Sequence, residues 1–273
     1  MPAIVSERAW GGSLAADSIN LFRRLSASAS RGAARYIPTR RCMMRNKRPI
    51  VSFTFDDVPD TAFTNGSAIL DRYGVKGTFY VAPGILGHAD EHWRVLDREQ
   101  LKELARRGHE IGCHTYSHVK VQTLCAERMA EENRRSIEAL TEICGPLKFE
   151  NFAYPFGVVS MPRKLQLQQQ FTSCRGIYSG INSGIIDLSL LRSVELYDRT
   201  LSPEQMRDVF DQTERMNGWL VLYSHDVADS PSWIGCSPKL MEMAVAEAKA
   251  RGLDCVPVSE ALQLIGADKT EIA

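Results

Sequence analysis

The stretch Ile50-Val51-Ser52-Phe53-Thr54-Phe55-Asp56-Asp57 places two acids directly after an apolar run of strand-forming residues. Two later apolar runs end in the same way, one before His114 and His118 and one before His225. The carboxyl ends of parallel strands in a barrel open on one face, so side chains from distant parts of the sequence can meet there. The sequence therefore predicts one shared site that contains Asp56, Asp57, His114, His118 and His225.

Strand-like and helix-like segments alternate along the chain from Lys47 onward. Apolar residues in the helix-like segments follow a 3.6-residue period, and several of these segments end at a glycine. About seven βα units require parallel strands with right-handed crossovers, in a barrel or in an open doubly wound sheet. The predicted strands are 50–55, 77–81, 109–113, 151–154, 174–178, 219–224 and 253–257, and the predicted helices are 63–73, 98–107, 126–143, 161–171, 203–216, 238–251 and 259–265.

The composition indicates one domain with one sizeable core, because the chain has 273 residues of which 44% are apolar. Its 33 Lys and Arg balance its 33 Asp and Glu, but residues 1–50 hold ten of the bases and only two of the acids. Residues 51–273 are therefore acidic by about eight charges. Nucleic-acid binding is not expected, since a basic footprint would have to lie in the first 50 residues.

Several features favour a cytoplasmic location. The seven cysteines are odd in number and form no C-x-x-C pair, which is typical of thiols in a reducing compartment. No stretch approaches the ~20 continuous apolar residues of a membrane span. Polar and charged residues interrupt residues 9–25, so the head has no apolar region of the kind found in a signal peptide.

Residues 1–47 are predicted to be a basic N-terminal extension, and residues 267–273 a short C-terminal tail. Within the extension, residues 18–25 can form a short amphipathic helix. One interpretation is an arm that makes peripheral contact with an anionic membrane surface. The favoured alternative is a loosely held, flexible tail.

A metal site is the chemical hypothesis that the acids and histidines support best. His114 and His118 are four residues apart and can present both imidazoles on one face of a helical turn, although this spacing alone is weak evidence. Two adjacent carboxylates beside apolar residues repel each other unless a cation or hydrogen-bond donors compensate. Two histidines and one carboxylate suit Zn²⁺ or a similar divalent ion that keeps a position open for water.

Four motifs follow one another along the chain: Thr54-Phe55-Asp56-Asp57, His114-Thr115-Tyr116-Ser117-His118, Tyr154-Pro155-Phe156-Gly157 and Leu222-Tyr223-Ser224-His225-Asp226. In this order and spacing they resemble the motifs of the polysaccharide deacetylases, the NodB-homology or carbohydrate esterase family 4. The resemblance covers roughly residues 48–262 and implies a catalytic domain over 48–266 with a distorted (β/α) barrel of fewer than eight strands, here about seven parallel ones. It also implies that Asp57, His114 and His118 hold the metal, that Asp56 is the general base and that His225 is the general acid.

The chemistry of these positions fits amide hydrolysis. The amide carbonyl is a poor electrophile and water is a poor nucleophile. A metal that polarises the carbonyl and acidifies a bound water compensates for both. The oxyanion needs donors, and we expect a backbone N–H near Phe156, within Tyr154-Pro155-Phe156-Gly157, to provide one. His225 suits the protonation of the leaving amine because its ordinary pKa lies near neutrality.

Two departures from the family pattern leave partners unassigned. Many members carry an arginine two residues before the proline of the third motif, where it orients the base, and here that position is Ala153. Arg175 and Arg192 are the candidates to replace it. The acid that pairs with His225 is also open, with Glu195, Asp198 and Asp226 as candidates, and Asp226 can alternatively cap the following turn.

Three tryptophans raise the question of sugar stacking. Trp219 lies inside an apolar strand and is expected in the core. Trp233 lies in the loop after His225 and is the better candidate for a sugar platform, because such loops form the rim of the site. Trp93 is also a candidate for sugar stacking, and the sequence does not decide whether it has this role.

The leading hypothesis is a metal-dependent hydrolase that removes acetyl groups from N-acetylhexosamine units of a polysaccharide, oligosaccharide or lipid-linked glycan. The alternatives are a deformylase or amidohydrolase of the same fold, or a catalytically silent carbohydrate-binding barrel. The silent barrel is an alternative because position 153 is Ala153, where many family members have an arginine. The expected partner is an acetylated sugar, and the oligomeric state is not predicted.

Overall fold

The computed structural model describes residues 28–267 of the chain. The predicted amphipathic helix over 18–25 lies outside these residues. None of the helices within 28–267 combines the length and the apolar character that crossing a bilayer requires.

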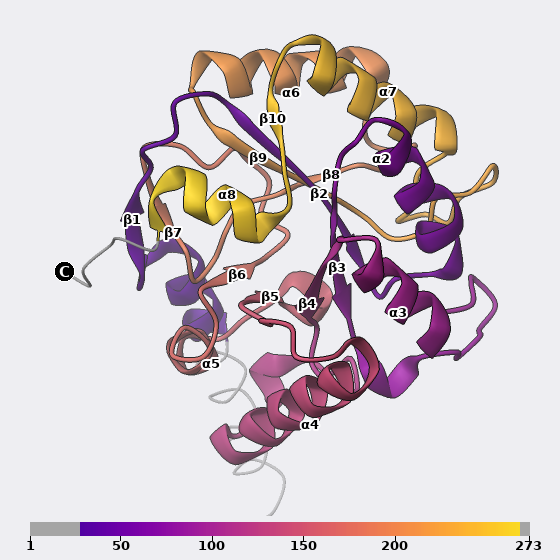
Figure 1. Cartoon of the computed structure of the whole chain (residues 1–273). Helices are drawn as coiled ribbons and strands as arrows, with labels where there is room; N and C mark the ends of the chain where they lie inside the picture. Colours follow the sequence, from indigo (N-terminus) through magenta and orange to yellow (C-terminus); the bar gives the residue numbers. More distant parts are fainter. Residues whose placement is uncertain (1–27, 268–273) are drawn as a thin grey trace, which may run out of the picture.

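A parallel sheet forms the centre of the molecule (Figure 1). Its strands follow the order β6-β5-β4-β3-β2-β9-β8, and β10 pairs with β2 beside this path. Every pairing in the sheet is parallel, as continuous apolar strands buried on both faces favour. The bounds are β2 Ile50–Asp56, β3 Thr78–Val81, β4 Glu110–Cys113, β5 Asn151–Ala153, β6 Ser173–Arg175, β8 Val194–Glu195, β9 Trp219–Ser224 and β10 Asp254–Cys255.

The barrel is distorted at two places. Along β2, Ile50 and Val51 pair with β10, whereas the end of the strand pairs with β3. The strands β6 and β8 are the two ends of the sheet path and do not pair with each other. Next to β6 lies the segment around Leu191, which donates to the carbonyl of Cys174 and accepts from the backbone of Gly176. The prediction of an α/β barrel with about seven parallel strands is confirmed, since seven strands form the continuous path of the sheet.

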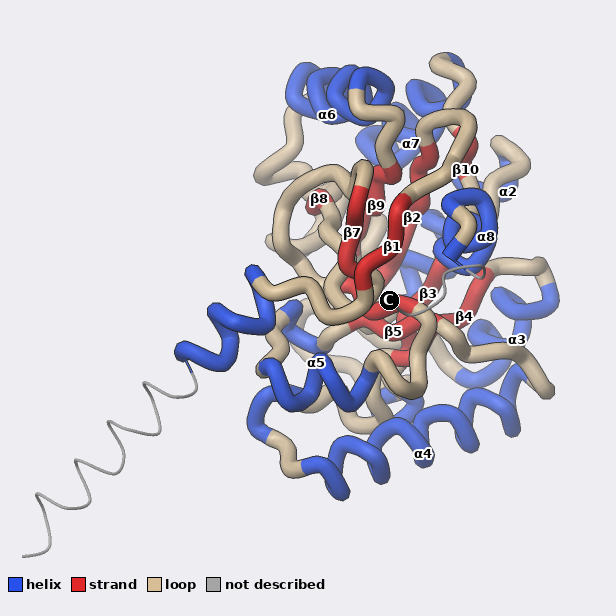
Figure 2. Tube along the Cα trace, turned by 90° about the vertical axis from the view of Figure 1, so that its left-hand side faces the viewer, coloured by secondary structure: helices blue, strands red, loops and turns tan. Residues whose placement is uncertain are grey.

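Helices cover the outside of the sheet (Figures 1 and 2). Their N-termini follow the capping rules, for example a capping box of Asp97 with Gln100 and another of Ser202 with Gln205. The helices are α2 Ala68–Arg72, α3 Arg98–Arg106, α4 Ala126–Cys144, α5 Met161–Leu167, α6 Pro203–Arg215, α7 Pro238–Ala250 and α8 Val258–Ile265, with short turns of other helix types at Ala62–Ser67, Pro83–Ile85, Val121–Thr123 and Pro155–Gly157.

The predicted elements are all found, with differences at their ends. The segment 63–73 begins as a π-helical turn and becomes α-helical only at Ala68. The helix predicted over 161–171 ends at Leu167, and the strand predicted over 174–178 is Ser173–Arg175. Three short strands were not predicted, β1 (Arg41–Met43), β7 (Ile185–Asp187) and β8, because strands of two or three residues show no period.

The described part of the N-terminal extension packs against the barrel (Figure 2). Residues 28–36 are helical, and β1 pairs antiparallel with β7. The buried ammonium group of Lys164 donates to the carbonyls of Ala34 and Ile37 and pairs with Asp187 at 2.6 Å. The division of the chain at residues 47 and 267 stays a prediction.

Candidate active site

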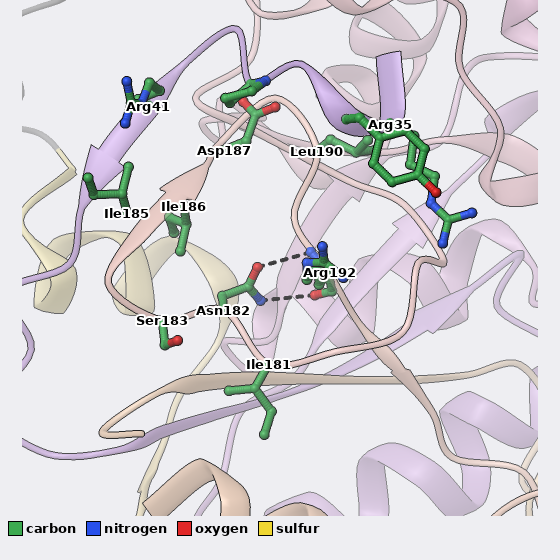
Figure 3. A pocket seen from close by; sticks show the side chains of 12 residues that line it. Arg35, Arg41, Ile181, Asn182, Ser183, Ile185, Ile186, Asp187, Leu190 and Arg192 are labelled. Atoms are coloured by element: carbon green, nitrogen blue, oxygen red, sulfur yellow. Dashed lines mark hydrogen bonds between the residues drawn. The ribbon is translucent and has the colours of Figure 1, made fainter. Parts of the chain in front are cut away.

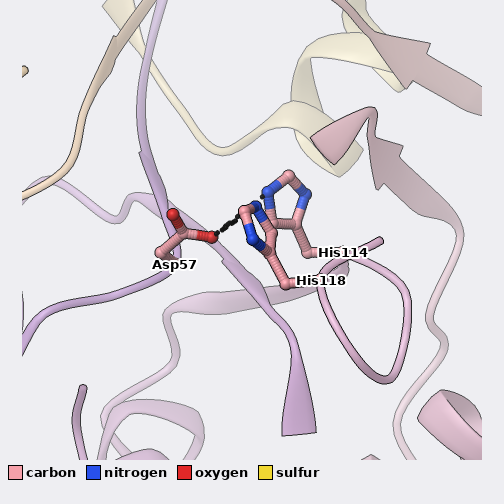
Figure 4. Close-up of side chains that lie close together, drawn as sticks. All are labelled: Asp57, His114 and His118. Atoms are coloured by element: carbon pink, nitrogen blue, oxygen red, sulfur yellow. Dashed lines mark ion pairs between the residues drawn. The ribbon is translucent and has the colours of Figure 1, made fainter. Parts of the chain in front are cut away.

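The structure brings Asp57, His114 and His118 together at the carboxyl ends of β2 and β4 (Figure 4). One ligand atom from each lies within 4.8 Å of the others. The Oδ1 atom of Asp57 lies 3.0 Å from Nε2 of His118 and 3.5 Å from Nε2 of His114. The predicted convergence of these side chains is therefore found in the geometry.

The backbone at Asp57 explains how two adjacent acids face one cavity. Successive residues of a regular strand point to opposite faces of the sheet. Asp57 has φ of 56°, in the left-handed region that non-glycine residues rarely adopt, and Val58 follows at 51°. This turn interrupts the alternation after Asp56, so both carboxylates line the same cavity. His118 also has a left-handed backbone, with φ of 51°.

The three side chains fit a divalent cation. Nδ1 of His114 lies 2.8 Å from the carbonyl oxygen of Ala153, so it donates its proton there and leaves Nε2 free for a ligand. Burial lowers the pKa of His114 to about 3 and also lowers that of His118, so both imidazoles stay neutral near pH 7. The buried Oδ1 of Asp57 has no hydrogen-bond partner among residues 28–267, and burial raises the pKa of this carboxyl to about 6. A bound cation would satisfy that oxygen and favour its ionised form.

Asp56 is held by a buried arginine. Arg175 donates from Nη2 to Oδ1 of Asp56, and its guanidinium lies 5.2 Å and 5.0 Å from the ring centroids of Tyr80 and Tyr223. Burial would raise the pKa of Asp56, but the positive charge of Arg175 and its hydrogen bond hold that pKa below the ordinary value. Asp56 is therefore ionised at neutral pH and able to accept a proton.

Of the two arginines considered for this role, the structure places only Arg175 against Asp56. Arg175 stands directly opposite Ala153 in the parallel register of β5 and β6, so both side chains leave the sheet at the same level. Arg192 instead donates to the carbonyl oxygen of Ser179 on the outside of the barrel.

His225 lines the same cavity and is oriented by the backbone. Its Nδ1 lies 3.1 Å from the carbonyl oxygen of Ile234, and its Nε2 lies 4.0 Å from Oδ2 of Asp57. The ring stacks on Trp93 with centroids 6.0 Å apart. Donation from Nδ1 to Ile234 keeps Nε2 directed toward the cavity.

Among residues 28–267, none of the three acids considered as the partner of His225 forms a hydrogen bond or ion pair with it. Asp226 accepts hydrogen bonds from the backbone and hydroxyl of Ser232, as the alternative interpretation of a turn cap predicts. Asp198 binds the backbone and hydroxyl of Ser237. Glu195 lines the cavity without a hydrogen bond of its own to His225. A backbone carbonyl carries no sequence signal, so the partner of His225 could not be found from residue types.

A cavity of about 380 Å³ joins these groups. Of the third motif, Phe156 and Gly157 line it, and Phe156 packs on His118 with ring centroids 4.6 Å apart. Tyr154 and Pro155 are buried and do not line the cavity, and the hydroxyl of Tyr154 donates to the carbonyl of Ser189, so their contact with substrate stays a prediction. Other lining residues were not predicted: Ile177, Tyr197, Arg199, Tyr223 and Ile234.

The tryptophans divide as expected. Trp233 is 62% exposed at the rim of the cavity, where the guanidinium of Arg199 lies 5.0 Å from its ring centroid. Trp219 is fully buried and donates from its indole to Ser52. Trp93 contacts His225 rather than standing free at the rim.

Comparison with known proteins identifies relatives of the chain. The sequence model of the family described as "Polysaccharide deacetylase" matches residues 44–171. A chitin deacetylase from Colletotrichum lindemuthianum is 26% identical over 248 residues, an alignment that covers 87% of this chain and 89% of that protein. A peptidoglycan-N-acetylglucosamine deacetylase from Bacillus cereus is 34% identical over 98 residues, which is 35% of this chain and only 32% of the relative.

The fold also matches solved structures. A family 4 acetyl xylan esterase from Clostridium thermocellum, described in complex with a cobalt ion, superposes with a TM-score of 0.56. The match covers 80% of this chain and 92% of that chain at 21% sequence identity. This similarity supports the NodB-like form of the barrel.

Proposed function

We propose that this chain is a metal-dependent hydrolase of the polysaccharide deacetylase family that removes N-acetyl groups from N-acetylhexosamine units of a glycan. The single observation that carries the proposal is the pairing of Asp56 with Arg175 beside the cluster of Asp57, His114 and His118. An ionised base, three metal-type ligands and a further histidine, His225, then share one cavity.

We propose that Asp57, His114 and His118 hold a divalent ion, with Zn²⁺ as the first choice from the two nitrogen ligands and one oxygen ligand. Such an ion would polarise the acetyl carbonyl and acidify a water. The unpartnered oxygen of Asp57 and the neutral imidazoles support this assignment. The C. thermocellum esterase is described in complex with a cobalt ion, which supports the proposal that this chain also binds a divalent cation.

The chain's own groups divide the proton transfers between them. Asp56 takes the proton from the attacking water, and Arg175 keeps it in the ionised, correctly oriented form. In its doubly protonated form, His225 gives the proton on Nε2 to the leaving amine and becomes neutral, while Nδ1 keeps its proton and its hydrogen bond to Ile234. Phe156 and Gly157 form the wall beside His118, where we propose that the backbone near Phe156 contacts the developing oxyanion.

The test is acetate release from N-acetylglucosamine oligomers by the purified full chain, before and after chelation. We expect release that chelation abolishes and Zn²⁺ or Co²⁺ restores. Asp56→Asn should lower turnover by at least about 100-fold, since general bases typically contribute at that level, while the metal content stays unchanged. Activity that survives exhaustive chelation would contradict the proposal.

The same assay separates the alternatives. A deformylase or amidohydrolase would act on formamide or ureide substrates and leave acetylated sugars intact. A silent barrel would bind sugar oligomers in calorimetry without releasing acetate under any metal. An acetylated xylan arm is included, because a similar structure is that of an acetyl xylan esterase.

A further inference from the structure

A second cavity of about 270 Å³ lies between residues 35–41 and residues 181–192 (Figure 3). It shares no lining residue with the active-site cavity. The backbone around it is well fixed, because Asn182 exchanges two side-chain hydrogen bonds with the backbone of Arg192 (Figure 3). We call this cavity and the exposed residues beside it the basic face: Arg35, Tyr36, Ile37, Arg41, Met43, Ile185 and Arg192.

The charge of the basic face is not compensated within the described residues. Arg35 lies over the rings of Tyr36 and Tyr178, and Arg192 donates to a carbonyl oxygen, but neither these two nor Arg41 has an acid partner among residues 28–267. The cavity contains one carboxylate, Asp187, and the ammonium group of Lys164 neutralises it from behind at 2.6 Å. Three guanidinium groups therefore remain available to an anion.

Apolar side chains stand beside these arginines. The register of β1 and β7 pairs Met43 with Ile185, and these side chains are 53% and 51% exposed. Tyr36, which lines the same cavity as Ile185, and its chain neighbour Ile37 are 72% and 53% exposed. Large exposed apolar side chains that gather in one place on a soluble domain indicate an interaction surface.

We propose that the basic face binds the surface of an anionic lipid membrane. The arginines would contact headgroup phosphates, and Tyr36, Ile37, Met43 and Ile185 would enter the boundary between headgroups and acyl chains. Charge complementarity selects this occupant over a neutral one, because each basic residue near an anionic leaflet adds to the attraction. Residues 51–273 hold 31 acids against 23 bases, so the bulk of the chain would not be drawn to such a surface on its own.

The experiment is co-sedimentation of the full chain with vesicles of phosphatidylcholine alone or with about one third phosphatidylglycerol. We expect binding only to the anionic vesicles and its loss in 0.5 M salt, since screening shortens the reach of charges to about 4 Å at that ionic strength. The triple variant Arg35→Gln, Arg41→Gln, Arg192→Gln should bind at least about tenfold more weakly, because each basic residue near an anionic surface adds to the attraction. The triple variant Tyr36→Ser, Met43→Ser, Ile185→Ser should also bind more weakly.

A matched control removes the same charge elsewhere. Arg98, Arg106 and Arg134 are exposed arginines on helices outside the basic face, and their triple change to Gln should leave vesicle binding as in the original chain. Thermal melting checks that every variant is folded, and it does not require deacetylase activity. A failure of membrane binding can therefore be distinguished from a failure of the proposed deacetylase function.

Three results would overturn the inference. The first is equal binding, or no binding, to neutral and anionic vesicles. The second is a basic-face variant that sediments like the original chain, which would place the lipid contact elsewhere. The third is that something other than a membrane occupies the basic face. Free phosphate would be the occupant if millimolar inorganic phosphate displaced vesicle binding at constant ionic strength. A second copy of the chain would be the occupant if light scattering showed a dimer that the basic-face changes convert to a monomer while vesicle binding persists.

Discussion

Arg175 decides how Asp56 behaves, although the two residues are 119 positions apart in the sequence. The family pattern expects an arginine at position 153, where this chain has Ala153. The register of β5 and β6 places Arg175 beside that alanine, so a strand neighbour provides the positive charge that the motif lacks. The loss of an arginine from the motif is thus compensated in space.

Moving the arginine back tests this compensation. Arg175→Ala should lower deacetylation by at least about 100-fold and reduce stability by roughly 3–5 kcal/mol, because it leaves a buried carboxylate without its partner. The double variant Ala153→Arg, Arg175→Ala should recover part of the deacetylation rate and part of the stability, since the new arginine side chain starts at the same level of the sheet. Turnover and urea denaturation measure the two effects. A folded double variant as inactive as the single one would contradict the argument.

Trp233 gives a second prediction at this scale. Trp233→Ala should raise KM for oligomers roughly fivefold to tenfold with kcat little changed, because it removes a stacking contact worth about 1 kcal/mol in ground state and transition state alike. The melting temperature should hardly change, since the ring is 62% exposed. Trp219→Phe is the matched control: it should lower the melting temperature and leave KM as it is. A KM unaffected by Trp233→Ala would rule out the sugar platform.

At the scale of elements, Lys164 of α5 fastens the described part of the N-terminal extension. Its ammonium group is fully buried, and its acceptors are the carbonyls of Ala34 and Ile37 and the carboxylate of Asp187. Helical residues 28–36, β1 and β7 are thereby held together by one side chain.

Lys164→Met should lower the free energy of unfolding by roughly 3 kcal/mol, because a buried carboxylate loses its counter-charge. Proteases should also cut the chain between residues 28 and 41 faster in this variant. Lys102→Met, at an exposed position of α3, should stay within about 0.5 kcal/mol of the original chain. Equal stability of the two variants would show that the extension is held by other contacts.

His109, just before β4, links pH to stability. Burial lowers its pKa to about 4, and its Nδ1 accepts a hydrogen bond from the backbone of Gly77. Below its ordinary pKa of about 6.5 the unfolded chain gains a proton that the folded chain does not, so stability falls as the pH drops from about 6.5 to 4.

We expect the original chain to lose about 3 kcal/mol more than His109→Asn between pH 7 and pH 4, since tenfold in proton affinity is worth about 1.4 kcal/mol. Urea denaturation at several pH values, compared between the two proteins, measures the difference and cancels the other titrating groups. Parallel curves over this range would contradict the assignment.

At the scale of the whole molecule, the candidate metal site ties β2 to the loop after β4, so a bound ion should stabilise the entire fold. Saturation about 100-fold above Kd adds about 2.7 kcal/mol. For a chain of this size, chelation should then lower the melting temperature by roughly 5–10 °C. Calorimetry with chelator and with added Zn²⁺ measures the shift.

Two variants control this experiment. His118→Ala should abolish the shift, because it removes one of the three ligands. His88→Ala changes an exposed histidine away from the cluster and should preserve it. A shift that survives His118→Ala would place the metal elsewhere.

The sequence by itself determined the βα order, the parallel sheet and the grouping of Asp56, Asp57, His114, His118 and His225, because hydrophobic period and strand-end position are local properties. Tertiary structure alone decided that Arg175 pairs with Asp56, that Ile234 orients His225, and that Asp226 caps a turn. These depend on strand register, on backbone carbonyls and on the left-handed turn at Asp57. The residue types offered Arg175 and Asp226 only as candidates beside others, because the choice among them is made when separate segments of the chain are packed together.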